Sequence, residues 1–239
     1  MDCRETVVLI VGAGRGIGRA SAKLFAEAGA SLILSARTEV ELFELEVELE
    51  QQFGGAALSI PADVTDAPSV ARLVEEAVRR FGRIDTLVYA AGVGVLKPFA
   101  ETTAEEFSLL MQTNVGGAFN VCQAVVPLME RQKSGRIIAI PGILGRAPMA
   151  QATAYCASKY ALTGMLKSLA LETKRVGIKI SLLHFGGVNS SFWDTITMRV
   201  QRERMLTVEA AARAVFFAAT QEGEGVLGEL VLQPESHQL

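Results

Sequence analysis

Short apolar runs alternate with amphipathic segments along the whole chain. Residues 6–11 form a β-branched run that predicts a first, buried strand, and residues 16–28 follow as a helix that ends at Gly29. The predicted strands span 6–11, 31–35, 56–60, 86–89, 135–140, 178–184 and 229–233, and the predicted helices span 16–28, 38–53, 68–81, 103–131, 153–175 and 207–220. There is no linker, internal repeat or low-complexity tract.

Two helix starts carry a more specific signal. Thr38 with Glu41, and Thr103 with Glu106, have the spacing of a capping box, in which each side chain satisfies a backbone N–H of the other. Strands that alternate with helices favour the α/β class. We therefore expect one domain over residues 1–239, with a doubly wound parallel sheet that has helices on both faces.

Composition narrows the class of protein. The chain has 239 residues, half of them hydrophobic, which fits one α/β domain with a sizeable core. A net charge of −3 argues against nucleic acid as a partner. Cys3, Cys122 and Cys156 are odd in number and widely spaced, so neither a metal site nor a disulfide framework is indicated, and a cytoplasmic location is expected. No signal peptide or membrane-spanning stretch is predicted.

A glycine-rich turn lies between the first predicted strand and the first predicted helix. Glycines at such a turn let the backbone approach a phosphate closely, and the N–H groups that begin the helix face it. An ordinary strand–helix turn is the alternative interpretation. The residues predicted to bind a dinucleotide here are Gly12, Gly14, Arg15, Gly16, Ile17 and Gly18.

The end of the second strand bears on which dinucleotide binds. An NAD site usually has an acidic residue here to hold the ribose 2′-hydroxyl, and this chain has Ser35, Ala36 and Arg37 instead. Arg37 could pair with a 2′-phosphate, and Arg15 could add a second positive charge. The alternative is that Arg37 only begins a surface loop. The sequence thus favours NADP(H), with NAD(H) still possible.

Tyr155 and Lys159 stand four residues apart in a predicted helix, so their side chains share one face. A lysine ammonium beside a phenol favours the phenolate, which brings proton exchange closer to neutral pH. A bound dinucleotide would supply a hydride carrier for such a proton donor. The alternative is an ordinary pair of helix-surface side chains.

Taken with these motifs, the rest of the chain resembles the short-chain dehydrogenase/reductase family in its small, one-domain form. Further segments that match in order are Asp63-Val64, Tyr89-Ala90-Ala91-Gly92, Asn114 and the run Phe185-Gly186-Gly187-Val188-Asn189-Ser190. The resemblance covers essentially the whole chain and implies a Rossmann-type fold. It also implies a small-molecule carbonyl or secondary alcohol as substrate.

The resemblance implies roles for individual residues. Tyr155 would donate or accept the proton, Lys159 would hold the nicotinamide ribose and lower the pKa of the tyrosine, and Asn114 would hold a water that links Lys159 to solvent. Further cofactor contacts are implied for Asp63, Val64, Ala90, Ala91, Gly92, Tyr155, Lys159, Gly186, Val188 and Ser190. Members of the family usually pair through two long helices, here 103–131 and 153–175, which implies a homodimer or homotetramer.

One departure from the family pattern bears directly on activity. Gly142 stands thirteen residues before Tyr155, where the family has its catalytic serine. Loss of one such donor typically costs about 2.7–4 kcal/mol of transition-state stabilisation. Thr153 could supply a hydroxyl, although a helix-cap role is expected for it. The alternative to a working oxidoreductase is therefore a cofactor-binding member with weak or no catalysis, acting as a sensor or assembly partner.

Three segments are expected to line the substrate site, at 94–98, 144–151 and 191–206. Their apolar side chains are Leu96, Leu144, Met149, Phe192, Trp193 and Met198. These residues suggest an apolar substrate, or else they pack a lid. Arg146 could meet a substrate carboxylate or be solvated.

Overall fold

The structure, a computed structural model, describes residues 2–236. Its strands are β1 (Val7–Val11), β2 (Ser31–Ser35), β3 (Ala57–Ser59), β4 (Thr86–Tyr89), β5 (Gly135–Ala139), β6 (Ile178–Phe185) and β7 (Glu229–Leu232). Its α-helices are α1 (Gly16–Glu27), α2 (Glu39–Phe53), α3 (Ala67–Phe81), α4 (Ala104–Met111), α5 (Gly117–Gln132), α6 (Thr153–Thr173) and α7 (Val208–Ala219). The predicted order of strands and helices is confirmed.

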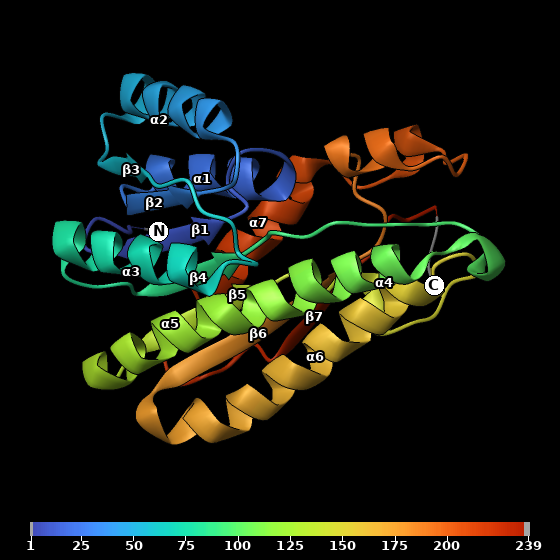
Figure 1. Ribbon diagram of the computed structural model, residues 1–239. Helices are drawn as coiled ribbons and strands as arrows, with labels where there is room; N and C mark the ends of the chain where they lie inside the picture. Colours follow the sequence, from blue (N-terminus) through green and yellow to red (C-terminus); the bar gives the residue numbers. More distant parts are fainter. Residues whose placement is uncertain (1, 237–239) are drawn as a thin grey trace.

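The strands form one seven-stranded sheet in the order β3-β2-β1-β4-β5-β6-β7, and every neighbouring pair is parallel. The chain starts at the middle with β1, moves outward to β3, and then crosses to the other side of β1 with β4 (Figure 1). Loops that leave β1 and β4 diverge at this point, which is where open α/β sheets bind their ligands. The predicted doubly wound parallel sheet is confirmed.

The sheet is covered on both faces because alternate strand residues point in opposite directions. Val7, Leu9 and Val11 join a core cluster with residues of α3, α5 and α6, whereas Val8 and Ile10 join one with residues of α1, α2 and α7. Figure 1 shows α5 and α6 side by side on one face, with α1 and α2 on the other. A strand with both faces buried explains the continuous apolar runs in the sequence.

The long helix predicted over 103–131 is interrupted. A π-helical turn, Gln112–Gly116, separates α4 from α5 and buries Thr113 and Asn114. The Tyr89 hydroxyl donates to the Thr113 carbonyl at 3.2 Å, so that carbonyl bonds outside the helix. Tyr89 thereby ties β4 to this turn. Such π-turns occur frequently at functional sites.

The capping predictions have mixed outcomes. Thr103 and Glu106 form the predicted box, since each side chain accepts a bond from the backbone N–H of the other, at 3.2 and 2.9 Å. The prediction at Thr38 is wrong, because its side chain makes no capping bond. Glu41 lies against the glycine turn instead, where a Cβ added at Gly14 would be 2.5 Å from its Oε2. The expected cap at Thr153 is also wrong, because Ala152 occupies the N-cap position.

Within residues 2–236, no helix is both long enough and apolar enough to cross a membrane.

Candidate active site

The glycine turn is shaped by close backbone contacts. Gly12 has a φ of 90°, and a Cβ there would lie 2.7 Å from the Ala91 nitrogen. A Cβ at Gly18 would lie 2.1 Å from the Gly12 carbonyl oxygen. A side chain at either position would therefore push the turn away from the loop after β4 or from α1. Glycine keeps the first turn of α1 accessible to a phosphate.

A cavity of about 1550 Å³ lies along the carboxyl ends of the strands. The predicted cofactor residues that line it are Gly12, Gly14, Arg15, Gly16, Ile17, Gly18, Arg37, Asp63, Val64, Ala90, Ala91, Gly92, Tyr155, Lys159, Gly186, Val188 and Ser190. The structure therefore brings all of them to one place, although they come from segments far apart in the sequence. Across residues 2–236, no group of three or more His, Cys, Asp or Glu side chains could hold a metal ion.

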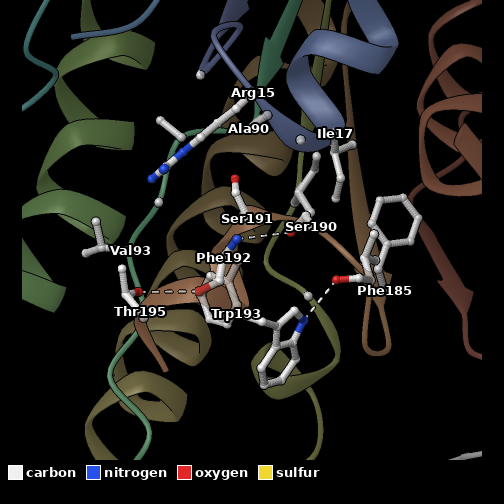
Figure 2. A pocket seen from close by; sticks show the side chains of 18 of the residues that line it. Arg15, Ile17, Ala90, Val93, Phe185, Ser190, Ser191, Phe192, Trp193 and Thr195 are labelled. Atoms are coloured by element: carbon white, nitrogen blue, oxygen red, sulfur yellow. Dashed lines mark hydrogen bonds between the residues drawn. The ribbon is translucent and has the colours of Figure 1, made fainter. Parts of the chain in front are cut away.

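Two arginines line the cavity, and Arg37 lies at the end next to β2. Arg37 is exposed and sits close enough to Asp63 to contribute to lowering the pKa of that carboxyl, after the two hydrogen bonds from Thr65. Arg15 extends from the glycine turn toward the space faced by Ser191 (Figure 2). Neither arginine has an ion-pair partner among the described residues. Both guanidinium groups are available to an anionic ligand.

Tyr155 and Lys159 lie at the opposite end of the cavity. The Lys159 ammonium is 5.5 Å from the centre of the Tyr155 ring and donates to the Ile140 carbonyl at 3.3 Å. Lys159 is only 5% exposed, and burial lowers its pKa to about 8. Burial raises the pKa of the Tyr155 hydroxyl, and Cys156 adds to that effect. Burial therefore sets the direction of the shift in the tyrosine pKa, which is opposite to the lowering that the resemblance implies.

Asn114 lies behind the cavity wall and is fully buried. Its amide nitrogen donates to the Val93 carbonyl and to Ser158 Oγ, both at 3.0 Å, and its oxygen accepts from the Val93 N–H at 2.9 Å. The side chain thus fixes the loop after β4 against α6. Ser158 was not predicted as part of this site, since nothing in its local sequence distinguishes it from a helix-packing serine.

Gly142 faces the cavity from the turn after β5, with a φ of 73° and a ψ of 173°. A Cβ there would meet only the Phe185 carbonyl, at 3.7 Å, so there is room for a side chain. The backbone conformation, however, lies in a region that is essentially restricted to glycine. Glycine is therefore required here for its conformation rather than for its size.

An apolar wall closes the reaction end. The Phe192 ring lies 5.7 Å from the Tyr155 ring, and Trp193 meets Phe192 edge-on at 5.2 Å. The indole N–H donates to the Val188 carbonyl at 2.9 Å, which fixes the segment that Figure 2 shows. The predicted lining residues gather in this cluster, which contains Leu96, Ile143, Leu144, Met149, Ala152, Tyr155, Cys156, Phe192, Trp193, Ile196 and Met198.

Two arginines outside the cofactor end have structural partners. Arg202, which the sequence did not single out, donates to Asn189 Oδ1, Asp194 Oδ1 and the Ser190 carbonyl at 2.6–2.9 Å. It holds the segment after β6 over the cavity. Arg146 pairs with Glu229 at 3.0 Å. Of the two interpretations of Arg146, the contact with a substrate carboxylate is therefore not supported.

A parallel doubly wound sheet, a glycine turn at its switch point and a tyrosine–lysine pair in the same cavity define an oxidoreductase that depends on a nicotinamide dinucleotide. The model of the short chain dehydrogenase family matches residues 6–200. The chain therefore belongs to the short-chain dehydrogenase/reductase family.

Similar proteins of known structure or name agree with this assignment. Sepiapterin reductase from Chlorobaculum tepidum is 34% identical over 237 residues, which cover 96% of each chain. An alcohol dehydrogenase from Thermococcus sibiricus, complexed with 5-hydroxy-NADP, is 25% identical with a TM-score of 0.91 over 98% of both chains. A metagenomic short-chain oxidoreductase in complex with NADP is 30% identical with a TM-score of 0.85, covering 97% of this chain and 98% of its own.

Proposed function

We propose that this chain is an NADP(H)-dependent oxidoreductase that interconverts a carbonyl and a secondary alcohol of a largely apolar small molecule. We further propose that residues 1–239 form one such domain. One observation carries the proposal: the Tyr155–Lys159 pair and the glycine turn line the same cavity, one at each end. A proton donor and a dinucleotide cradle in one cavity are the two parts that this chemistry needs.

The cofactor end fits a 2′-phosphorylated dinucleotide. Gly12 and Gly18 leave no room for a Cβ, so the backbone itself forms the cradle. Ser35 and Ala36 offer no carboxylate for a ribose 2′-hydroxyl, while Arg37 and Arg15 offer positive charge. The two similar structures described above were solved with NADP or 5-hydroxy-NADP. Together these features support NADP(H) over NAD(H).

In the proposed reaction, the nicotinamide supplies or accepts the hydride when it is bound. The Tyr155 hydroxyl donates its proton to the carbonyl oxygen during reduction and takes it back during oxidation. The Lys159 ammonium holds the ribose and offsets the negative charge that the phenolate develops. Asn114 fixes the loop that carries Val93 and, as a further proposal, positions a water between Lys159 and solvent.

The cavity supports an apolar substrate. Leu96, Leu144 and Phe192 belong to one apolar cluster against Tyr155. A ring or chain without charge loses little hydration when it enters such a site, whereas a charged substrate would need a partner there. Arg146, which follows the turn after β5, is already paired with Glu229.

The test is NADPH oxidation, followed by absorbance, with a panel of aliphatic and aromatic ketones and aldehydes, each matched to a carboxylated analogue. Turnover of several apolar carbonyls, and weaker turnover of the carboxylated analogues, is the expected result. Tight NADPH binding with no turnover of any compound would instead favour the alternative, a cofactor-binding sensor or assembly partner. The named reductase and dehydrogenase activities of similar proteins do not favour that alternative.

The proposed assembly is a homodimer or homotetramer in the cytoplasm. Exposed apolar side chains on α5 and α6 support pairing through these helices, among them Phe119 and Tyr160, which are 50% and 43% exposed. The three cysteines are free and buried, which suits a reducing compartment. Light scattering coupled to size-exclusion chromatography would give the number of subunits.

A further inference from the structure

His184 lies on β6 and is fully buried, yet it has no part in holding the cofactor or moving the proton. Its Nδ1 lies 3.0 Å from the carbonyl oxygen of Gly142. Since a carbonyl oxygen can only accept, Nδ1 must carry the hydrogen. The imidazole therefore donates to the main chain of the turn that stands where the family has its serine.

The conformation of Gly142 is what directs its carbonyl to this donor. A φ of 73° with a ψ of 173° is open to glycine and strained for other residues. The same carbonyl also accepts from the Gly145 N–H at 3.1 Å. One oxygen thus collects two donors, which fixes the peptide plane on the wall of the cavity.

The same turn is bonded to the helix that carries the reacting groups. Lys159 Nζ donates to the carbonyl two residues before Gly142. Thr163 Oγ1 lies 3.2 Å from the Gly145 carbonyl and 2.9 Å from the Lys159 carbonyl, and its one proton is shared between them. Both donors belong to α6, which also contains Tyr155. These two contacts lie at the ends of the turn. At its middle, the Gly142 N–H donates to the Leu183 carbonyl at 3.3 Å, and His184 is the side chain that bonds the Gly142 carbonyl.

The far side of the imidazole meets a fixed charge. His184 Nε2 makes no hydrogen bond to any described residue and lies 3.9 Å from Glu229 Oε2. Glu229 also pairs with Arg146 and Lys167, and the bond from Lys167 lowers the pKa of the carboxyl. A ring placed between a carboxylate on β7 and a carbonyl of the turn has little freedom to rotate.

We propose that His184 is a positioning residue: it holds the Gly142 turn in the shape that places a substrate carbonyl against Tyr155. The inference rests on the proposed function, because the turn lines the proposed substrate cavity. Where most of the family is expected to use a serine hydroxyl on this turn, this chain fixes the turn from behind with a buried imidazole. A misplacement of about 1 Å in such a wall can cost about 100-fold in rate.

Three variants separate positioning from bulk stability. An asparagine at this site places an amide N–H close to where Nδ1 lies, a glutamine places it close to Nε2, and a leucine has no donor. We expect His184→Asn to keep most of kcat, and His184→Gln and His184→Leu to lower kcat about tenfold or more, with the Kd for NADPH unchanged in all three. Equal losses for Asn and Gln, unchanged turnover in Leu, or a matching loss of NADPH affinity would overturn the proposal.

Hydrogen exchange gives a second test that needs no substrate. The Gly145 amide donates to the Gly142 carbonyl, so its exchange reports whether the turn is held. Exchange of peptides covering 140–152 should accelerate in His184→Gln and His184→Leu but not in His184→Asn. If His184→Leu does not fold, the comparison of His184→Asn with His184→Gln still tests the proposal, because both side chains end in an amide and differ only in where its N–H lies. Equal exchange rates in His184→Asn and His184→Gln would overturn the proposal. This test does not depend on the proposed function, because it can be read even if wild type turns over no compound of the carbonyl panel.

Discussion

The two ends of the cavity are built in different ways. At the nucleotide end, the main chain does most of the shaping: Gly12 and Gly18 let segments approach so closely that a Cβ would clash. At the reaction end, side chains fix the main chain, as Asn114 does for the loop after β4 and His184 does for the turn after β5. One end depends on positions where a side chain must be absent, and the other on particular donors.

This difference explains why the two ends tolerate change differently. A backbone cradle binds any ligand with the right phosphates, so it can stay the same while the substrate changes. The turn after β5 is bonded by side chains of α6 and β6, so substitution of those side chains can change its shape. Gly142 in place of a serine is a change within this turn. Four predictions test how far the two ends are separable.

The largest effect is expected for Tyr155→Phe, which keeps the ring that packs on Phe192 and removes the hydroxyl. Turnover should fall by about 10²- to 10⁴-fold, the usual contribution of a general acid or base. The Kd for NADPH, measured by fluorescence titration, should hardly change, because the cradle lies at the other end. If the variant keeps most of its turnover, Tyr155 is not the proton donor.

Burial of Lys159 should appear as a pH dependence of stability. Its pKa is about 8 in the folded protein, against 10.5 for an unperturbed lysine, so the folded state binds fewer protons than the unfolded state between these two pH values. Stability then rises with pH in that window, and the full shift corresponds to roughly 3 kcal/mol. Chemical denaturation should show that the free energy of unfolding of wild type rises from pH 8 to 10 relative to that of Lys159→Met. Lys174→Met, at an exposed position, controls for the loss of one lysine.

The features that could be predicted from the sequence are those set by neighbouring residues, and the features that were missed are set by contacts between distant residues. The glycine turn, the alternation of strands and helices and the capping box at Thr103 depend on neighbours in sequence, and all three were predicted. At Thr38 the reciprocal bond is absent, and the Glu41 side chain lies against Gly14 through a tertiary contact. The π-turn accepts a bond from Tyr89 on β4, 24 positions away, and the His184 contact joins residues 42 positions apart. No local pattern signals either one.

A smaller effect is expected at the other end of the cavity for Arg37→Ala. Loss of a charge-assisted contact to the 2′-phosphate should lower the ratio of NADPH to NADH affinity by about tenfold. The affinity for NADH is the internal control and should stay the same, because NADH has no phosphate there. Titrations of both cofactors at one ionic strength measure the ratio. Equal losses for both cofactors would show that Arg37 supports the loop rather than the phosphate.

The smallest effect is expected from the hydroxyl in Gly142→Ser, and its matched control is Gly142→Ala. Both variants place a Cβ in free space but at a φ of 73°, so both should lose about 1–3 kcal/mol of unfolding free energy. They differ only in the hydroxyl. If His184 and the turn already do what a serine does elsewhere, the two variants should turn over NADPH at nearly equal rates, both at or below wild type.

The opposite outcome has a distinct signature. A hydroxyl that restores a missing transition-state contact should raise kcat of Gly142→Ser over both Gly142→Ala and wild type, by about tenfold or more. The comparison with alanine is essential, because a drop caused by backbone strain would otherwise conceal a gain from the hydroxyl. Measured on one carbonyl panel, a serine-specific gain would mean that the reaction end is impaired. Equal rates would mean that the reaction end is specialised, with the turn shape set by His184 rather than by residue 142.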